Sequence, residues 1–142
     1  MTINCEIVSQ DRLVYSGEVD MVVIPGAAGE MGILPHHAPV LTSLNYGVIT
    51  VKVSGKEEHF TVAGGIAEVL PTQVTILADA AENVEEIDVD RAMKAKQRAE
   101  ESLKQTKATD IDRYMRVTSA LKRSNLRLQA AQKYRKFTKP KI

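Results

Sequence analysis

Five charged residues in the second half of the chain have the types and the spacing to bind an anion. Asp88, Arg91 and Arg98 are separated by three and seven residues, so they line one face of a helix. Arg123 and Arg127 are four residues apart and share a face of a second helix. Guanidinium groups that converge repel one another unless an anion lies between them, and phosphate suits their paired donors. The pattern therefore indicates a site for a phosphate-bearing ligand that would stabilise the folded pair of helices.

The two arginine faces meet only if the helices form a hairpin. Folding the chain about Lys107-Ala108 brings residues whose numbers sum to about 215 opposite each other. Asp88 then faces Arg127, and Arg91 faces the level of Arg123. We therefore expect three arginines, with Arg98 nearby, to converge beside one carboxylate.

A purely local interpretation of Asp88 remains open beside this one. Asp88 stands immediately before a helical run and is a good N-cap, and Asp90 suits the positive end of the helix. Arg91 could then simply pair with either carboxylate. The local sequence does not decide between a cap alone and a cap that also holds a ligand.

Other site chemistries lack the residues that they need. The glycine-rich segment Gly26–Gly32 has no Gly-Lys-Ser/Thr of a phosphate-binding P-loop. His36 and His37 are adjacent, which is not a metal-ligand spacing, and His59 is the only other histidine. Cys5 is the only cysteine, so no intrachain disulfide can form, and we expect it to be a small apolar residue of a strand. No Ser/His/Asp arrangement or carboxylate pair indicates catalysis.

The elements that must position the arginines follow from a change of period near residue 85. Before it, β-branched residues alternate in short runs such as 48–53, and Gly or Pro separates the runs, which is typical of an antiparallel sandwich or barrel. Ser54-Gly55 reads as a hairpin turn. After it the apolar period is helical. We predict a β domain over residues 1–86 and an antiparallel two-helix hairpin over 87–142.

The two predicted helices differ in their apolar stripes. The stripe of the first is small: Ala92, Ala95, Ala99 and Leu103. The second helix begins after an N-cap at Thr109 or Asp110. Its stripe consists of Ile111, Tyr114, Met115, Thr118, Leu121, Asn125 and Leu128. Because polar residues interrupt that stripe and packing supplies most helical stability, the hairpin either detaches from the β domain or stays docked on it; both remain open.

The net charge of +1 hides an asymmetry. No Asp or Glu follows Asp112, whereas basic residues are frequent there: Arg113, Arg116, Lys122, Arg123, Arg127, Lys133, Arg135, Lys136, Lys139 and Lys141. Such a segment fits an acidic protein surface, a nucleotide phosphate or nucleic acid. Aromatic residues for base stacking are few. We expect neither a signal peptide nor a membrane-spanning helix.

Four motifs resemble one protein family. Gly29–Pro39 resembles the Gly-Glu-Leu-Gly-Ile-Leu-Pro-Gly-His-Ala-Pro segment of ATP synthase epsilon subunits, and Ala63–Val69 is similar to their Ser-Gly-Gly-x-x-Glu-Val. Val74–Asp79 is also similar, and Ile87–Ala92 matches Ile/Leu-Asp-x-x-Arg-Ala. The resemblance runs in order from about Ile3 to about Leu128. Motifs of this kind at consistent spacing are specific as a set, although each is weak alone.

The resemblance implies an N-terminal β-sandwich, a C-terminal two-helix domain and the role of a non-catalytic rotor subunit. The implied partners are the gamma subunit, the c-ring and, through the C-terminal helices, the alpha and beta catalytic subunits; nucleic acid is not implied. The location implied is peripheral, on the cytoplasmic face of the bacterial plasma membrane, with the plastid thylakoid as the alternative. Contact with the membrane would be indirect. A free-standing ATP-sensing module is the alternative function.

The resemblance also assigns residues. It implies that Glu30 lies toward the c-ring and His37 near gamma. It implies that a basic helix face inhibits ATP hydrolysis when the helices extend: Arg113, Arg116, Lys122, Arg123 and Arg127. It implies no required cofactor, but ATP as a regulatory ligand that some bacterial members bind. Matching positions for ATP are Glu82, Ile87, Asp88, Arg91, Ala92, Arg98, Arg123 and Arg127.

Two positions depart from the family pattern. His36 replaces a glycine, and a turn that needs φ > 0 tolerates histidine less well, so the local loop geometry is in question. Ala63 replaces a serine and removes one hydrogen-bonding group. Neither departure affects the expected fold.

Overall fold

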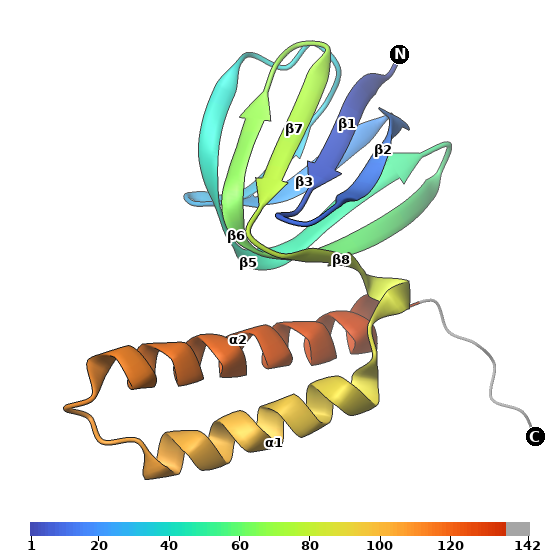
Figure 1. Ribbon diagram of the computed structural model, residues 1–142. Helices are drawn as coiled ribbons and strands as arrows, with labels where there is room; N and C mark the ends of the chain where they lie inside the picture. Colours follow the sequence, from blue (N-terminus) through green and yellow to red (C-terminus); the bar gives the residue numbers. More distant parts are fainter. Residues whose placement is uncertain (136–142) are drawn as a thin grey trace, which may run out of the picture. The chain divides into compact units, whose positions relative to one another are not determined.

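Residues 1–135 are described by a computed structural model (Figure 1). The chain divides into two compact units, Met1–Val84 and Glu85–Ile142. The first unit is built of strands and the second of two long helices, as the change of apolar period predicts. Each unit is described below by itself.

The first unit is a β-sandwich. Within the described residues it has eight strands: β1 (Ile3–Val8), β2 (Leu13–Val19), β3 (Met21–Gly26), β4 (Gly29–Ile33), β5 (Val40–Val53), β6 (Lys56–Val69), β7 (Gln73–Ala78) and β8 (Ala81–Asn83). The strand order is β2-β1-β7-β6-β5-β3-β4, with β8 paired to β6. β1 and β7 are parallel and the other pairs are antiparallel. The curved sheet folds over on itself, which confirms the predicted fold class (Figure 1).

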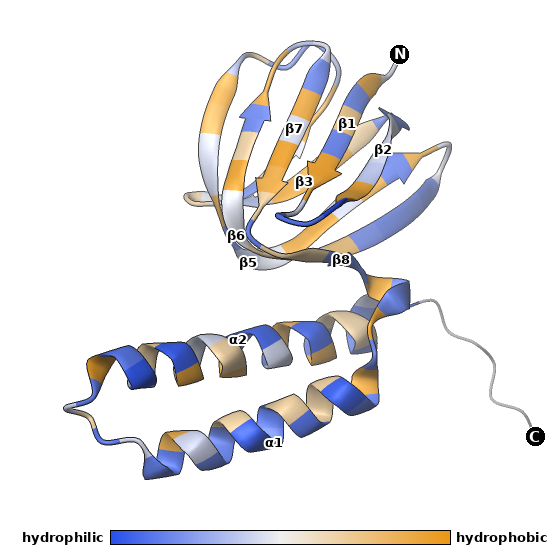
Figure 2. Ribbon diagram, in the orientation of Figure 1, coloured by the Kyte–Doolittle hydropathy of each residue, from blue (hydrophilic) through white to orange (hydrophobic). Residues whose placement is uncertain are grey.

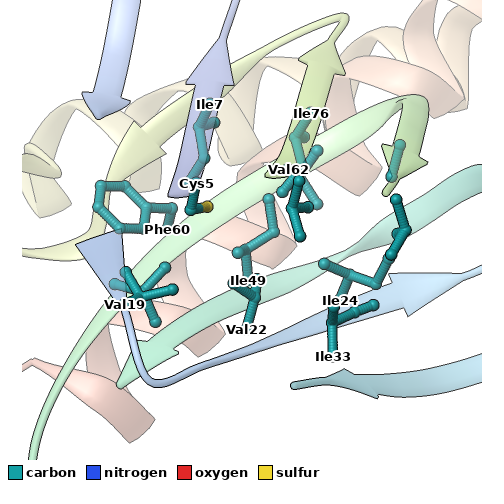
Figure 3. Packing of buried hydrophobic residues seen from close by; sticks show 14 of the residues in the cluster. Cys5, Ile7, Val19, Val22, Ile24, Ile33, Ile49, Phe60, Val62 and Ile76 are labelled. Carbon is teal, nitrogen blue, oxygen red and sulfur yellow. The ribbon is translucent and has the colours of Figure 1, made fainter. Parts of the chain in front are cut away.

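The core between the layers is aliphatic. Buried and exposed positions alternate along β1, β3 and β7, so one face of each strand is apolar (Figure 2). Isoleucine and valine supply most of the fully buried side chains, and Phe60 is the one large aromatic among them (Figure 3). The Phe60 ring packs edge-on against that of Tyr15, with ring centroids 5.4 Å apart. Cys5 is fully buried, and burial, with a smaller effect from Glu6, raises the pKa of its thiol to about 12. The thiol is therefore protonated at neutral pH and does not act as a nucleophile.

Gly65 is required where β5 and β6 bend. The pairing of these strands passes from Leu44 opposite Gly65 to Tyr46 opposite Ala63, so one residue on each strand is left over. Gly64 and Gly65 have φ angles of 86° and 131°. A Cβ atom on Gly65 would lie 2.3 Å from the carbonyl oxygen of Leu77. Both the backbone angle and the contact with β7 therefore select glycine.

His36 adopts the left-handed conformation expected at its position. Its φ is 66°, the region that glycine occupies most easily. The backbone N–H of His36 donates to the carbonyl of Pro71 at 2.8 Å, and that of His37 donates to the carbonyl of Leu34 at 3.1 Å. These bonds hold the turn in place although histidine is less suited to it than glycine.

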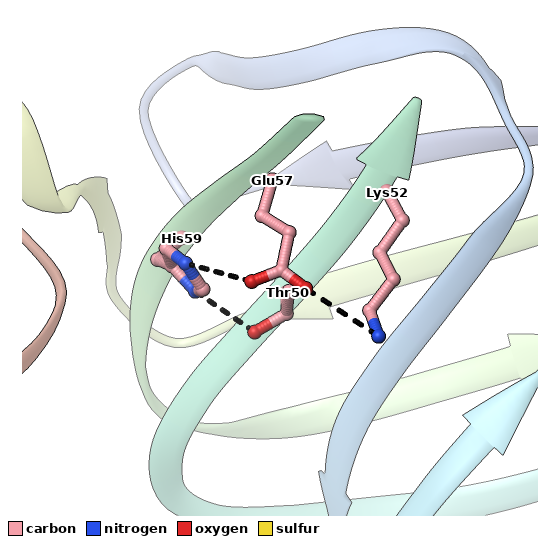
Figure 4. A network of polar contacts seen from close by, with 4 residues as sticks. All are labelled: Thr50, Lys52, Glu57 and His59. Atoms are coloured by element: carbon pink, nitrogen blue, oxygen red, sulfur yellow. Dashed lines mark hydrogen bonds and ion pairs between the residues drawn. The ribbon is translucent and has the colours of Figure 1, made fainter. Parts of the chain in front are cut away.

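A polar network covers part of the outer surface of β5 and β6. Thr50 Oγ1 lies 2.9 Å from His59 Nδ1, and His59 Nε2 lies 3.5 Å from a carboxylate oxygen of Glu57 (Figure 4). The other oxygen of Glu57 is 3.4 Å from Lys52 Nζ. The four residues form two cross-strand pairs, Thr50 with His59 and Lys52 with Glu57. They make up a surface network between strands, a common form of sheet stabilisation.

The second unit is a helical hairpin. A short 3-10 turn, η1 (Val84–Glu86), leads into α1 (Val89–Gln105), and α2 (Ile111–Tyr134) returns antiparallel to it (Figure 1). Asp88 caps α1, and Asp110, one of the two residues expected, caps α2. Each aspartate accepts a hydrogen bond from the backbone N–H three residues later, at 3.0 Å from Arg91 and 3.2 Å from Arg113. These are standard N-caps.

The stripe predicted for α1 is buried at Ala92 and Ala99 and half-buried at Ala95 and Leu103, whereas the stripe predicted for α2 is wrong at its start. Ala92 and Ala99 are buried, whereas Ile111, Tyr114 and Met115 are 65%, 45% and 61% exposed. The reason is that α2 begins beyond the end of α1, so its first turn has no helix beside it (Figure 1). Further along, small residues are buried instead: Ser124, Ala130 and Ala131. Small side chains on both helices allow a close approach.

Replacing Gly65 by alanine should lower the free energy of unfolding by clearly more than the ~1–3 kcal/mol of a strained backbone angle alone, because the new Cβ also meets the backbone of β7. Gly29→Ala is the matched control, since Gly29 has a φ of 133° but no atom within 4 Å of its added Cβ. Chemical denaturation of both variants measures the difference. Equal losses would contradict the close contact at Gly65.

Candidate functional site

Asp88 already has a structural role at the start of α1. Its Oδ1 accepts the backbone N–H of Arg91 at 3.0 Å, and its side chain is exposed. The helix N-terminus also carries Asp90, which suits the positive end of the helix dipole. The capping interpretation of Asp88 is thus confirmed. The cap uses one oxygen of the carboxylate, and the binding of a ligand by Asp88 stays a prediction.

A hollow lies on one flank of the hairpin, between the two helices. α1 lines it with Ala95, Arg98, Ala99 and Ser102, and α2 lines it with Arg116, Val117 and Ala120. Two guanidinium groups from different helices thus border one concave surface. Within residues 1–135, neither side chain forms a hydrogen bond or an ion pair. The hollow is therefore basic without a carboxylate partner at either arginine.

Helical spacing places the remaining arginines on the same flank. Arg91 is seven residues before Arg98, which is two turns along one face of α1. Arg123 and Arg127 follow Arg116 by seven and eleven residues, which again is one face of α2. We call this flank the arginine groove, formed by Arg91, Arg98, Arg116, Arg123 and Arg127. All five side chains are exposed.

Two hollows show which levels of the helices come together. The guanidinium of Arg135 donates to the carbonyl of Ile87, and Val89 and Met93 line the opposite flank together with Leu128, Ala131 and Gln132. The numbers of facing residues sum to about 220 on that flank, but to about 215 in the hollow at Arg98, where Ala95 lies with Ala120. The expectation that Asp88 faces Arg127 stays a prediction.

Arginines of the two helices come close in one place that the structure shows directly, because Arg98 and Arg116 line the same hollow. Sequence reasoning omitted Arg116 from the ligand-binding set. Its spacing of seven residues from Arg123 was the available signal.

Three other residues predicted to bind the ligand are buried or lie outside the hairpin. Ile87 and Ala92 are 4% and 1% exposed, and the carbonyl of Ile87 already accepts from Arg135. Glu82 lies on β8 of the first unit, opposite Thr61 of β6. Their contact with a nucleotide stays a prediction, as does that of the arginines.

Glu30 and His37, which are expected to lie near the c-ring and the gamma subunit, are at opposite ends of β4. Glu30 is exposed beside the tight turn that joins β3 and β4, where Gly26 pairs with Gly29. His37 lies beyond the other end of β4, and its Nδ1 is 2.7 Å from the carbonyl oxygen of Ala38. The ring nitrogen must carry a proton to donate in this contact. The two residues are thus placed for two separate contacts.

The outer face of the sandwich carries exposed apolar side chains. Ile66 of β6 pairs with Leu77 of β7, and they are 44% and 49% exposed. Val8 of β1 pairs with Leu77 on its other side. These three residues border a hollow together with Ser9, Gln10, Gly65, Ala78 and Asp79. Neighbouring exposed apolar residues at a hollow are typical of a protein contact surface.

The basic residues predicted for an inhibitory face are all on α2. Arg113, Arg116, Lys122, Arg123 and Arg127 are exposed. Lys136, Lys139 and Lys141 lie outside the described residues. In the part of the chain that the structure describes, no cluster of three His, Cys, Asp or Glu residues is arranged to hold a metal ion. Neither α1 nor α2 has an apolar stretch long enough to cross a bilayer.

Comparison with known proteins identifies the family. Residues 2–84 match the family model of the ATP synthase delta/epsilon chain beta-sandwich domain, and residues 85–132 match its long alpha-helix domain. The chain belongs to the ATP synthase delta/epsilon chain family. The relationship predicted from the four motifs is confirmed.

Several bacterial ATP synthase epsilon chains are similar over most of their length. The chain is 44% identical over 137 residues to that of Dehalococcoides mccartyi, covering 92% of this chain and 93% of the relative. It is 46% identical over 128 residues to that of Nitratidesulfovibrio vulgaris, covering 90% and 94%. For Alkalihalophilus pseudofirmus the identity is 50% over 111 residues, covering 78% and 84%.

Two solved structures share the fold. A chain of the Euglena gracilis mitochondrial ATP synthase, in a structure of OSCP, F1 and c-ring, is 27% identical with a TM-score of 0.76, and the match covers 92% of this chain and 81% of that one. A chain of the Tetrahymena thermophila mitochondrial ATP synthase, from its central stalk and c-ring, is 12% identical with a TM-score of 0.56, covering 92% and 97%. The second likeness shows the fold alone.

Asp88→Ala should lower the stability of the first turn of α1 by about 1 kcal/mol, because it removes the cap, whereas Asp88→Asn should have little effect, because asparagine caps as well as aspartate. Amide hydrogen exchange of residues at the start of α1 measures both. Asp90→Ala serves as a control for loss of charge in the same turn. If Asp88→Asn is as destabilising as Asp88→Ala, charge and not the cap sets the stability.

Proposed function

We propose that the chain is a non-catalytic subunit of the ATP synthase rotor. Its sandwich would bind the gamma subunit and the c-ring, so that rotation driven by proton transport is coupled to ATP synthesis. Its helical hairpin would move, and in an extended position would inhibit ATP hydrolysis at the alpha and beta subunits. The subunit would be peripheral, on the cytoplasmic face of the bacterial plasma membrane, and would touch the lipid only indirectly.

The observation that carries this proposal is that the two units present different surfaces, one apolar and one basic. The first unit offers an exposed apolar surface at Ile66 and Leu77 on a sandwich whose core is complete without the helices. In the second unit, the buried residues of the two helices are small. Its helix α2 carries a basic face, and no acidic residue follows Asp112. The first unit suits a permanent attachment and the second suits a reversible one. The Euglena gracilis chain that is 27% identical occurs in an assembly of OSCP, F1 and c-ring, which supports this arrangement.

Glu30 and His37 support two attachments for the sandwich. They lie at opposite ends of β4, so one end would approach the c-ring while the other approaches gamma. Torque transmitted through such a body requires a rigid scaffold. The close-packed aliphatic core and the continuous hydrogen bonding of the sheet supply that rigidity.

Removal of Asp88–Ile142 should leave the chain able to assemble with the synthase and should raise ATP hydrolysis under conditions in which the intact enzyme is inhibited. The reason is that the sandwich keeps its own core while the basic face is lost. Assembly by co-purification and hydrolysis by phosphate release are the measurements. A full-length variant with Gln at Arg113, Arg116, Lys122, Arg123 and Arg127 should reproduce much of the rise. Unchanged hydrolysis in an assembled truncated enzyme would refute inhibition.

A second function, regulatory ATP binding, is supported by the arginine groove. Its five guanidinium groups come from two helices, and Arg91, Arg98, Arg116 and Arg123 make no recorded side-chain ion pair within residues 1–135. A nucleotide that contacts both helices would stabilise the closed hairpin through its preference for that state. ATP would then oppose the extended, inhibitory position. This links the two proposed properties of the hairpin.

Titration of the full chain with ATP in a calorimeter tests the second function. We expect saturable binding, weakened roughly ten-fold or more in Arg91→Ala because a charge-assisted hydrogen bond is lost. Lys133→Ala is the control, since Lys133 lies over the ring of Tyr134 at the far end of α2, outside the groove. Absence of binding at millimolar ATP would remove the regulatory role and leave the rotor role standing.

A further inference from the structure

A mostly apolar hollow lies on the flank of the hairpin away from the arginine groove. Six residues from both helices line it: Val89, Met93, Leu128, Ala131, Gln132 and Arg135. Its volume of about 430 Å³ leaves room for a large side chain. Met93 lies in this hollow and is nevertheless 49% exposed. An exposed large apolar residue in a hollow favours a surface that another segment covers.

The chain leaves α2 at this hollow. The helix ends at Tyr134, and the next residue, Arg135, lines the hollow and donates to the carbonyl of Ile87. Seven further residues, 136–142, follow in the sequence. Phe137 is two residues beyond Arg135, so the Cα atoms of the two residues lie within about 7 Å of each other. The covalent chain therefore keeps the ring of Phe137 within reach of the hollow.

The charges of the two segments are complementary. Residues 136–142 contain no acidic residue and three lysines: Lys136, Lys139 and Lys141. Residues 85–90, at the start of α1, contain no basic residue and four carboxylates: Glu85, Glu86, Asp88 and Asp90. A segment that placed its aromatic ring in the apolar hollow would bring its lysines toward these carboxylates. Such an arrangement of charges favours one orientation of the segment.

Two further arguments favour this segment over a separate partner. The thioether of Met93 makes favourable contacts with aromatic rings, and Phe137 is the only phenylalanine outside the sandwich. A segment joined to the hollow by two residues also acts at a high effective concentration, on the order of millimolar. It therefore binds ahead of a second copy with the same intrinsic affinity.

We propose that residues 136–142 bind in the apolar hollow of the hairpin, with Phe137 against Met93 and Leu128. The lysines of the segment would then lie beside the carboxylates at the start of α1. The bound segment holds the end of α2 to the start of α1, so that the helices separate at this end only after the segment is released. This proposal does not depend on the binding of ATP.

Chymotryptic cleavage of the full chain after Phe137, followed by mass spectrometry, tests the proposal. The protease cleaves the fraction in which the ring is released. Met93→Gln should raise the rate of this cleavage about five-fold or more, because a polar side chain weakens the contact with the ring. Met93→Leu conserves the apolar volume and should keep the rate within about two-fold of that of the unaltered chain.

Met115→Gln is the matched control. Met115 is also an exposed methionine, at 61%, but it lies at the start of α2 and does not line the hollow. It should leave cleavage after Phe137 unchanged. Cleavage after Tyr114 in the same digests reports unfolding of α2 and should not change in any variant.

Amide hydrogen exchange provides a second measurement that leaves the hollow unaltered. Phe137→Ala should raise exchange at residues 89–93 about five-fold or more, because the end of α2 no longer holds the start of α1. Thr138→Ala should have little effect. Circular dichroism verifies that the helices are retained in each variant.

Equal cleavage after Phe137 in the unaltered chain and in Met93→Gln would overturn the proposal, as would unchanged exchange in Phe137→Ala. The digests are repeated over a hundred-fold range of chain concentration. Protection of Phe137 that is independent of concentration supports binding within one chain. Protection that increases with concentration would show a second copy in the hollow and would also overturn the proposal.

Discussion

The small side chains between α1 and α2 are the constraint on which the behaviour of the hairpin depends. Ala92 and Ala99 of α1 and Ser124 and Ala131 of α2 are buried. An alanine buries about one methyl group, worth ~0.8 kcal/mol, against about 1.5–3 kcal/mol for a large aliphatic side chain. The buried hydroxyl of Ser124 bonds to the carbonyl of Ala120 at 3.0 Å, within its own helix. The fully buried residues of the hairpin are therefore small, which allows the helices to lie close together.

The close approach of the helices has a chemical consequence. Because the helices are close, long arginine side chains on the same flank of each border a shared groove. A ligand that bridged this flank would add to the stability of the hairpin. The sandwich differs from the hairpin, because large aliphatic side chains of isoleucine and valine fill its core.

Much of this architecture follows from sequence. The period change near residue 85, the caps at Asp88 and Asp110 and the alanine stripe of α1 each rest on local rules, and each is found in the structure. The requirement for φ > 0 at His36 likewise followed from the glycine that usually stands there.

The level at which α2 meets α1 could not be predicted in this way. Apolar periodicity favoured Ile111, Tyr114 and Met115, but these residues precede the region of contact. The first turn of α2 extends beyond the end of α1. This extension depends on the path of residues 106–110 and on how Ser124 and Ala131 pack against the alanines of α1, and both are tertiary properties. The positive φ angles at Gly64 and Gly65 also depend on a neighbouring strand, β7.

The protonated thiol of Cys5 has a practical consequence for studying motion. It is the only sulfhydryl group of the chain, and it lies inside the sandwich, where alkylating reagents have no access. A cysteine introduced on each helix can therefore take a fluorophore or spin label without first removing the native one. Distances between such probes would follow the opening of the hairpin in an otherwise unaltered subunit.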